Sequence, residues 1–134
     1  MTTPLGIGIV GCGYWGPNLI RSFDRLPEAR VVALCDADPG RLAQQRALYP
    51  AAQGYGDFDA FLAHPGLDAV ALATSAPTHF SLARRVLEAG KPAFVEKPLT
   101  LSSSDARRLV ALAESRGVPL MVGHLLEYHP AVEY

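Results

Sequence analysis

The stretch GIGIVGCGYWGPNLIRSF, from Gly6 to Phe23, decides the fold. It opens with branched apolar residues, which predict a strand buried on both faces, and closes with the spacing of an amphipathic helix. Between the two lie three glycines, Gly11, Gly13 and Gly16. Glycine weakens regular structure, so three at this spacing need a reason. We hypothesise that the backbone here must approach a phosphate group closely.

Apolar runs and amphipathic stretches alternate along the rest of the chain. Strands are predicted at 5–10, 30–35, 51–57, 68–74, 92–96 and 119–124, the third being the weakest, and helices at 14–26, 38–49, 58–64, 77–90 and 102–117. This order predicts an α/β fold, a doubly wound parallel sheet of strand order 3-2-1-4-5-6 between two layers of helices. Ser102 to Ser104 are candidate caps of the last helix.

Composition narrows the function classes. The chain has 134 residues with a formal net charge of −1 and no basic run, so nucleic acid is an improbable partner. No apolar stretch approaches the ~18 residues that a membrane helix needs, and the N-terminus lacks the pattern of a secretion signal. We therefore expect a cytoplasmic protein. Cys12 and Cys35 form neither a CxxC pair nor a zinc spacing, so we expect two reduced thiols and no metal.

The three glycines match the GxGxxG pattern between a strand and a helix that dinucleotide-binding folds require. Gly11 would allow a sharp turn, Gly13 would let a pyrophosphate approach the backbone, and Gly16 would let the helix lie against the strand. Free N–H groups at the helix start attract negative charge. A glycine-rich turn that binds nothing is the alternative.

An acid twenty residues after the last of these glycines supports the same reading. Asp36 ends the second strand, where a carboxylate accepts hydrogen bonds from the adenosine ribose and repels a 2′-phosphate. The sequence thus favours NAD over NADP, although Arg41 follows about a helical turn later. Alternatively, Asp36 caps a helix or stabilises a turn.

Residues at the carboxyl ends of later strands are further candidates. Glu96, Lys97 and Pro98 come directly off the fifth strand. Lys97 could stabilise an alkoxide or polarise a carbonyl beside a nicotinamide, and Pro98 could hold a cis or bent backbone that aims it. A solvated lysine is the alternative. His124, at the end of the sixth strand, faces the same edge and could approach the nicotinamide.

For three aromatic residues near these loops, the sequence allows two roles each. His79 begins the helix after the fourth strand and is either a ligand or a capping or packing side chain. Tyr14 and Trp15, inside the glycine loop, are expected either exposed at the cofactor edge or packed on a neighbouring loop.

Several blocks together resemble the Gfo/Idh/MocA family of oxidoreductases: GIVGCGYWGPNLIRSF, CDADPGRL, ATSAPTHF, LEAGKPAFVEKPLT and VGHLLEYHP. The resemblance implies an NAD- or NADP-dependent oxidoreductase of sugars, cyclitols or nucleotide-linked sugars. It implies that Lys97 lies near the nicotinamide as the catalytic residue, with Glu96 and Pro98 completing its motif. It also places cofactor contacts in the loop of Thr74, Ser75 and His79, and places His124 at the nicotinamide end. Ser75 and Glu127 depart from the family pattern, where proline and a basic residue are common.

The resemblance also bears on domain organisation. We expect residues 1–123 to form the dinucleotide-binding Rossmann domain and residues 124–134 to begin a C-terminal substrate domain that is missing here. The chain alone would then be catalytically incomplete. A stand-alone NAD-binding or regulatory module is the alternative. Apolar surface left at the sixth strand predicts self-association into a homo-oligomer.

Overall fold

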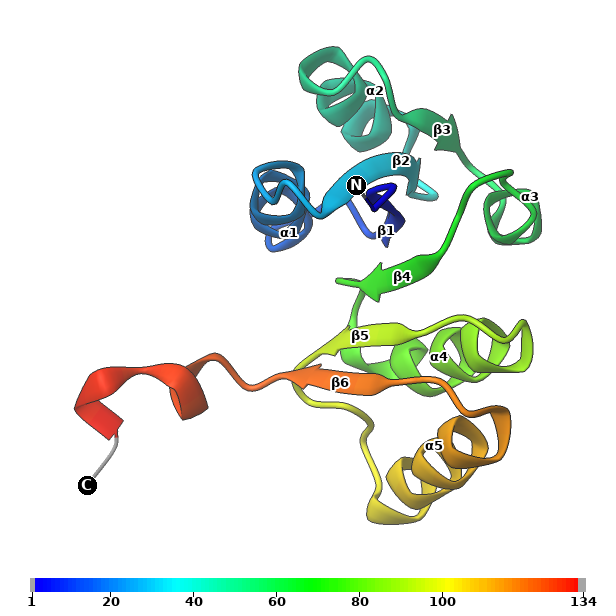
Figure 1. The fold of residues 1–134 in the computed structure, drawn as a ribbon, viewed down its shortest axis with the longest axis vertical. Coiled ribbons are helices and arrows are strands. Elements are labelled where there is room, and N and C mark those ends of the chain that lie inside the picture. The colour runs from blue at the N-terminus through cyan, green and yellow to red at the C-terminus, as the bar shows by residue number, and fades with distance from the viewer. Residues whose placement is uncertain (1, 133–134) are drawn as a thin grey trace.

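A computed structural model describes residues 2–132. Its six strands form one parallel sheet of order β3-β2-β1-β4-β5-β6 (Figure 1), which confirms the predicted topology. The strands are β1 (Leu5–Val10), β2 (Ala29–Cys35), β3 (Gln53–Tyr55), β4 (Ala69–Leu72), β5 (Ala93–Glu96) and β6 (Leu120–Gly123). The chain reverses direction across the sheet between β1 and β4, so the loops after these two strands diverge and leave a crevice at their carboxyl ends.

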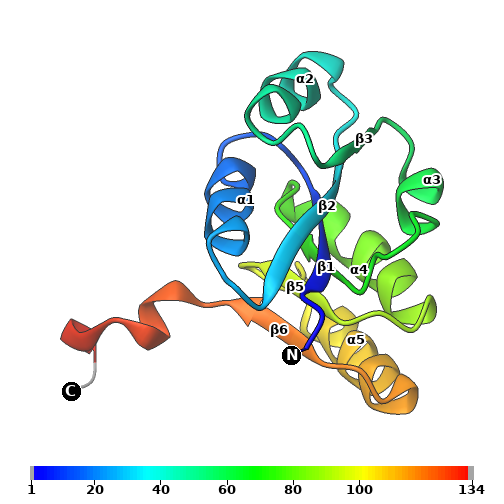
Figure 2. The same ribbon diagram turned by 45° about the horizontal axis from the view of Figure 1, so that its top comes forward.

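The helices lie on both faces of the sheet, as Figure 2 shows. The helices α1 (Gly16–Asp24) and α2 (Pro39–Leu48) cover β1 to β3 on one face, and α3 (Phe58–Leu62), α4 (His79–Glu88) and α5 (Ser103–Arg116) lie on the other. Each face buries its own apolar cluster: Ile20 of α1 packs with Ile9 and Leu34 on one face, and Leu72 and Val95 lie under α4 on the other. The central strands are buried on both sides, as their continuous apolar runs predicted.

Local signals in the sequence explain where the helices begin and end. The Asp38 side chain accepts from the amides of Gly40 and Arg41 and so caps α2. Of the three candidate caps of α5, Ser102 is the one that accepts, from the amide of Asp105 at 3.1 Å. Gly117 ends α5 at a φ of 65°, a conformation that favours glycine.

The predicted strand at 68–74 is longer than the observed β4, which ends at Leu72. Residues 73–75 leave the sheet as a loop, and a single 3-10 turn at Ala76–Thr78 leads into α4. β5 and β6 likewise end before the residues of interest, so Lys97 and His124 stand on loops at the carboxyl edge. The shorter strands bring these side chains to the edge where ligands of parallel sheets bind.

On the α1 side of the sheet, Phe23 of α1 packs edge-on against Phe94 of β5, and β6 lies beyond it as the edge strand. Met121 on β6 is 46 % exposed there, and the chain then runs away from the body as two 3-10 turns, Leu125–Tyr128 and Pro130–Val132 (Figure 1). We call this surface, made of Met121, Leu125, Leu126, Tyr128 and Val132, the β6–tail face. It is an apolar surface of the kind that associates in water.

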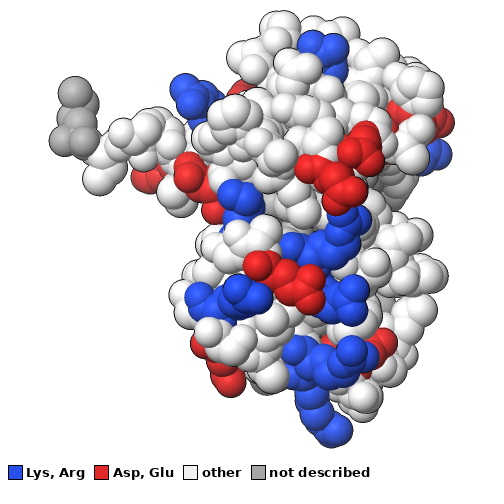
Figure 3. Space-filling model, turned by 90° about the vertical axis from the view of Figure 1, so that its right-hand side faces the viewer, with Lys and Arg blue, Asp and Glu red and all other residues white. Residues whose placement is uncertain are grey.

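The opposite side of the molecule carries mixed charge. Figure 3 looks onto the side of α3, α4 and α5, where basic and acidic side chains intermingle. Arg84 pairs with Glu88 at 3.6 Å, and Arg85 pairs with Asp59. Acidic side chains therefore neutralise part of the basic surface over these helices. Within residues 2–132, no helix is long and apolar enough to cross a membrane.

Candidate dinucleotide-binding site

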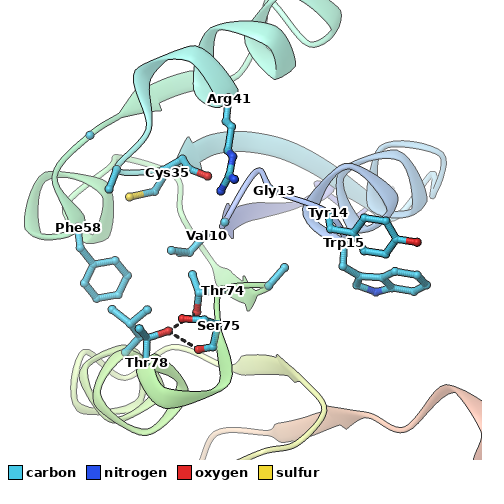
Figure 4. Close-up of a pocket in the computed structure, with 16 residues that line it drawn as sticks. Val10, Gly13, Tyr14, Trp15, Cys35, Arg41, Phe58, Thr74, Ser75 and Thr78 are labelled. Atoms are coloured by element: carbon cyan, nitrogen blue, oxygen red, sulfur yellow. Dashed lines mark hydrogen bonds between the residues drawn. The ribbon is translucent and has the colours of Figure 1, made fainter.

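A pocket of about 620 Å³ opens at the carboxyl ends of β1, β2 and β4 (Figure 4). Its volume falls in the range of small-molecule and cofactor sites. Eight of the candidate residues line it: Gly11, Gly13, Tyr14, Trp15, Asp36, Arg41, Thr74 and Ser75. The fold therefore brings the glycine loop, the end of the second strand and the loop after the fourth strand into one site.

Packing within the protein itself accounts for the first glycine. Gly11 has a φ of 96°, and a Cβ there would lie 2.7 Å from the carbonyl oxygen of Ala73. Its amide donates to the carbonyl oxygen of Cys35 at 2.8 Å. The turn therefore requires a residue that tolerates positive φ and has no side chain. This confirms the sharp turn predicted at the end of the first strand.

The other two glycines differ in what a side chain would meet. A Cβ on Gly16 would overlap the carbonyl oxygen of Gly11, so α1 packs against the turn only because this residue is glycine. A Cβ on Gly13 would meet only the Arg41 guanidinium, at 3.4 Å, an ordinary contact distance. Neither a positive φ nor close packing by the protein requires glycine at position 13. The space above it is open to the pocket.

The same loop leaves backbone donors unpaired. Within residues 2–132, the amides of Gly13, Tyr14, Trp15 and Gly16 have no acceptor in the protein. Trp15 precedes α1 without a side-chain cap, and Pro17 follows in its first turn. Unpaired amides at a helix start carry partial positive charge and suit an anion. Open space above Gly13 and free donors beside it fit the diphosphate of a dinucleotide.

Asp36 is held rigidly at the wall of this pocket. One carboxylate oxygen accepts from the amide of Cys12 at 2.7 Å, and the other accepts from the amide of Asp38 at 2.7 Å. Because Asp38 caps α2, Asp36 is not the helix cap, although its bond to the Asp38 amide is a turn contact. Each oxygen of a carboxylate accepts more than one hydrogen bond, so capacity remains for hydroxyl groups of a ligand.

Long side chains line the rim of the pocket. Figure 4 shows Arg41 reaching from α2 toward Gly13. Its ion pair with Asp38 spans 3.9 Å between largely exposed groups and constrains it little. Tyr14 is 96 % exposed and Trp15 37 % exposed, so Tyr14 is free of packing, as one of the two readings expected, while Trp15 is partly packed.

The loop after β4 forms the opposite wall. Thr78 Oγ1 donates to the carbonyl oxygen of Ser75 at 2.6 Å and lies 2.7 Å from Thr74 Oγ1, as the dashed lines in Figure 4 mark. Since Thr78 has one hydroxyl proton and gives it to Ser75, Thr74 donates in the second bond. These bonds fix Thr74 and Ser75 against the pocket.

The remaining candidates stand apart from this pocket. Lys97, Pro98 and His124 line a neighbouring pocket of about 610 Å³ together with the tail, and the Lys97–Pro98 peptide bond is cis. Glu96 lines an apolar pocket of about 230 Å³, which Trp15 and His124 share. Trp15 therefore adjoins both the glycine-loop pocket and the region of Glu96 and His124.

His79 lies beneath these surfaces rather than in them. Its side chain is 1 % exposed, and both ring nitrogens bond to backbone carbonyl groups. Of the two readings left open by the sequence, the buried packing residue describes its position in the structure. A direct contact with a bound cofactor is not supported by this burial.

Sequence reasoning missed an apolar part of the main pocket. Gly56 and Phe58 follow β3, and Leu82 projects from α4 into the same space. The signal was available for the first two, because they follow a strand that ends at the same edge as β1 and β2. The prediction did not use this signal, because the third strand was the weakest of the six. Leu82 carries no signal in the sequence, since its place depends on how α4 packs.

The two thiols are inert by environment. Burial, together with the nearby Asp36 carboxylate, raises the pKa of Cys12 to about 12 and that of Cys35 to about 11. Both cysteines are free and buried. A thiol with such a raised pKa stays protonated near neutral pH and is a poor nucleophile.

Comparisons with known proteins agree with this geometry. The sequence model of the Gfo/Idh/MocA oxidoreductase family, NAD-binding Rossmann fold, matches residues 5–124. The chain belongs to this family. The family assignment covers the glycine loop, Asp36 and the Glu96–Pro98 segment alike.

Individual members of the Gfo/Idh/MocA family resemble the chain over most of its length. It is 38 % identical over 125 residues to D-apiose dehydrogenase of Paraburkholderia graminis, covering 93 % of this chain and 33 % of that protein. It is 30 % identical over 127 residues to UDP-N-acetylglucosamine 3-dehydrogenase of Acidithiobacillus ferrooxidans, covering 95 % of this chain and 39 % of that protein. The chain thus spans about a third of the length of these relatives.

A solved structure of the same fold contains the cofactor. GenD2 from gentamicin A biosynthesis, in complex with NAD, superposes with a TM-score of 0.92 at 33 % identity, covering 97 % of this chain and 37 % of that one. The Rossmann fold and the strand order of this Gfo/Idh/MocA domain are therefore those of an NAD-bound relative.

Proposed function

We propose that this chain is the coenzyme-binding domain of an NAD-dependent oxidoreductase. The observation that carries the proposal is the glycine loop, where the space above Gly13 is open and the neighbouring amides lack acceptors. The amides of residues 13–16 would hold the diphosphate, because they are positive and unpaired. Apolar side chains at Phe58 and Leu82 would enclose the adenine ring.

NAD is the coenzyme that the second wall of the pocket favours. The Asp36 carboxylate would accept hydrogen bonds from the ribose hydroxyl groups and repel a 2′-phosphate. Two backbone amides fix the carboxylate, so it cannot easily turn away from such a phosphate. Arg41 is the one basic group that lines the pocket, and its guanidinium lies over Gly13 at the glycine-loop side.

Lys97 is the proposed catalytic residue. Nicotinamide supplies hydride chemistry when it is bound. Lys97 is exposed at the carboxyl end of β5, where its ammonium group would stabilise negative charge on a substrate oxygen. His124 lines the same pocket and would contribute at the nicotinamide end. The names of the relatives support a hydroxyl group of a sugar, cyclitol or nucleotide-linked sugar as the reacting group.

We propose the division at residue 123 as the domain boundary. Residues 1–123 form the Rossmann domain, and residues 124–134 lead toward a substrate domain like the remainder of the longer relatives. The proton-transfer residue would then belong to that second part, and this chain alone would turn over poorly. A regulatory NAD-binding module is the second candidate, since it needs the same pocket without turnover.

Titration of the chain with NADH and NADPH, followed by nicotinamide fluorescence, tests the proposal. We expect saturable binding of NADH, at least about tenfold tighter than NADPH. The double variant Asp36→Ala, Ala37→Arg exchanges repulsion for attraction at the ribose and should reverse this preference. Ala37→Arg alone keeps the carboxylate and is the control. Absence of binding to either coenzyme, or an unchanged preference in the double variant, would contradict the proposal.

A sugar-dependent rise in NADH absorbance would separate the enzyme from the regulatory module.

A further inference from the structure

His79 makes a contact that neither the glycine loop nor Lys97 explains. It is the first residue of α4, and only it and Gln45 are buried polar residues within residues 2–132. Its Nδ1 lies 2.7 Å from the carbonyl oxygen of Pro98, and its Nε2 lies 3.0 Å from the carbonyl oxygen of Thr74. One imidazole ring therefore connects two loops.

Both loops belong to the proposed site. Thr74 lies on the loop after β4, whose neighbours Ala73 and Ser75 line the main pocket with it. Pro98 follows Lys97 directly, so a bond to the Pro98 carbonyl group fixes the backbone one residue beyond the proposed catalytic side chain. The loops are joined to neighbouring strands, but the hydrogen bonds between them at this point pass through the His79 ring.

The two partners determine how many protons the ring carries. Carbonyl oxygens only accept, so each nitrogen must donate to complete its bond. A neutral ring has a single N–H and would turn the lone pair of its other nitrogen toward a carbonyl oxygen, leaving a buried polar contact unmade. Two donors require the imidazolium form. No carboxylate within residues 2–132 bonds to the ring.

Two opposing physical effects act on a positive charge buried at His79. Burial and the positive end of α4 disfavour a cation at this position. Two charge-assisted hydrogen bonds to carbonyl groups favour it, and each is stronger than a bond between neutral groups. The distances of 2.7 Å at Nδ1 and 3.0 Å at Nε2 both lie within the range of donated N–H···O hydrogen bonds.

We propose that His79 is a positioning residue, which holds the Thr74 and Pro98 carbonyl groups together through a doubly protonated ring and so sets the place of Lys97 relative to the nicotinamide side of the pocket. This inference rests on the proposed function for its consequence, but the clamp itself is a property of the free chain. The ring acts through Lys97 and Thr74 and touches no ligand.

Nitrogen NMR of the chain tests the proton count directly. Four histidines are present, and the His79 ring signals are those absent from the His79→Phe variant. We expect both His79 ring nitrogens to carry a proton. A single ring proton would overturn the double-donor clamp. The proton count is read from the unaltered chain and needs no NADH. If His79→Phe does not fold, His79→Gln serves to assign the signals.

Selective labelling tests the effect on the catalytic loop. Lys91 and Lys97 are the only lysines, so the chain labelled with [¹⁵N]lysine gives two backbone amide signals. His79→Phe should shift or broaden the Lys97 signal. The Lys91 signal should stay unchanged, because Lys91 follows the opposite end of α4, where its side chain donates to the carbonyl oxygen of Leu67. An unchanged Lys97 signal in a folded variant would overturn the positioning role.

Binding measurements connect the clamp to the proposed site. In folded His79→Phe, affinity for NADH should fall about three- to tenfold, the effect of about one lost hydrogen bond, whereas affinity for ADP should stay unchanged. Equal losses for both ligands would show general damage to the pocket and overturn the inference. If the unaltered chain bound no NADH, the proposed function would fail, while both NMR results would still decide the clamp.

Discussion

At the scale of single residues, the three glycines of one motif differ in what requires glycine at each position. Gly11 needs positive φ, Gly16 needs close packing against the Gly11 carbonyl group, and Gly13 needs neither. The sequence predicted the sharp turn at Gly11 and the close packing at Gly16, because glycine spacing after a buried strand is a local signal. The role of Gly13 beside a phosphate stays a prediction. It could not predict that Asp36 bonds to the amide of Cys12, since that contact depends on how β1 and β2 are paired.

The buried thiols give a prediction on pH. In the unfolded chain both ionise near pH 9, while in the native protein their pKa values are about 12 and 11. Below pH 9 the native and the unfolded state both keep the two thiol protons, so the thiols leave the free energy of unfolding unchanged. Between about pH 9 and about pH 11 only the unfolded state loses these protons, so the free energy of unfolding declines as pH rises. Urea unfolding across that range measures this.

Other groups also titrate in this range, so the decline needs a matched variant. Replacing Cys12 and Cys35 by alanine removes both thiols, and the slope of stability against pH above 9 should become shallower. An identical slope in this variant would show that the thiols ionise freely in the native protein. Native thiols should also react with iodoacetamide far more slowly than thiols of the unfolded chain.

At the scale of elements, short strands place the site. The sequence predicted all six strands and their order, yet it extended β4 to residue 74, because the apolar run continues past the point where pairing stops. Since β4 ends at Leu72, Thr74 is free to reach the pocket. Periodicity cannot detect such an end, which depends on how far the neighbouring strands extend.

Helix capping provides a test at this scale. Ser102 accepts from the amide of Asp105, and Ser103, the first residue of α5, makes no side-chain hydrogen bond within the described residues. Ser102→Ala should lower the free energy of unfolding by about 1 kcal/mol. Ser103→Ala should change it by less than about 0.5 kcal/mol. Equal effects of the two substitutions on the free energy of unfolding, measured with urea, would show that Ser102 is not the cap of α5.

At the scale of the whole molecule, one part of the sheet lacks a covering layer. The β6–tail face exposes Met121, Leu125, Leu126, Tyr128 and Val132, with between 46 % and 70 % of each residue accessible. The family resemblance, which implies a second domain beyond the sixth strand, predicted exposed apolar surface at that strand. It could not predict that the chain leaves the body there, because that follows from the three-dimensional course of the tail.

We expect the chain to self-associate through this face as concentration rises, since exposed apolar side chains are buried on contact. Met121→Lys should weaken association measured by light scattering. Val110→Lys is the matched control, because Val110 is equally exposed, at 45 %, but lies on α5 away from the face. A monodisperse monomer at high concentration, or an equal effect of both substitutions, would argue against this surface.

The central claim is that the open space above Gly13 holds a coenzyme diphosphate, and titration of Gly13→Ala with NADH tests it most directly. The added Cβ meets only the flexible end of Arg41, so the variant should fold and its stability should change by less than about 1 kcal/mol. Gly16→Ala, whose Cβ overlaps the Gly11 carbonyl oxygen, should instead be destabilised by about 1–3 kcal/mol. We expect folded Gly13→Ala to bind NADH at least about tenfold more weakly than the unaltered chain. Equal NADH affinity in the two proteins would contradict a diphosphate site above Gly13.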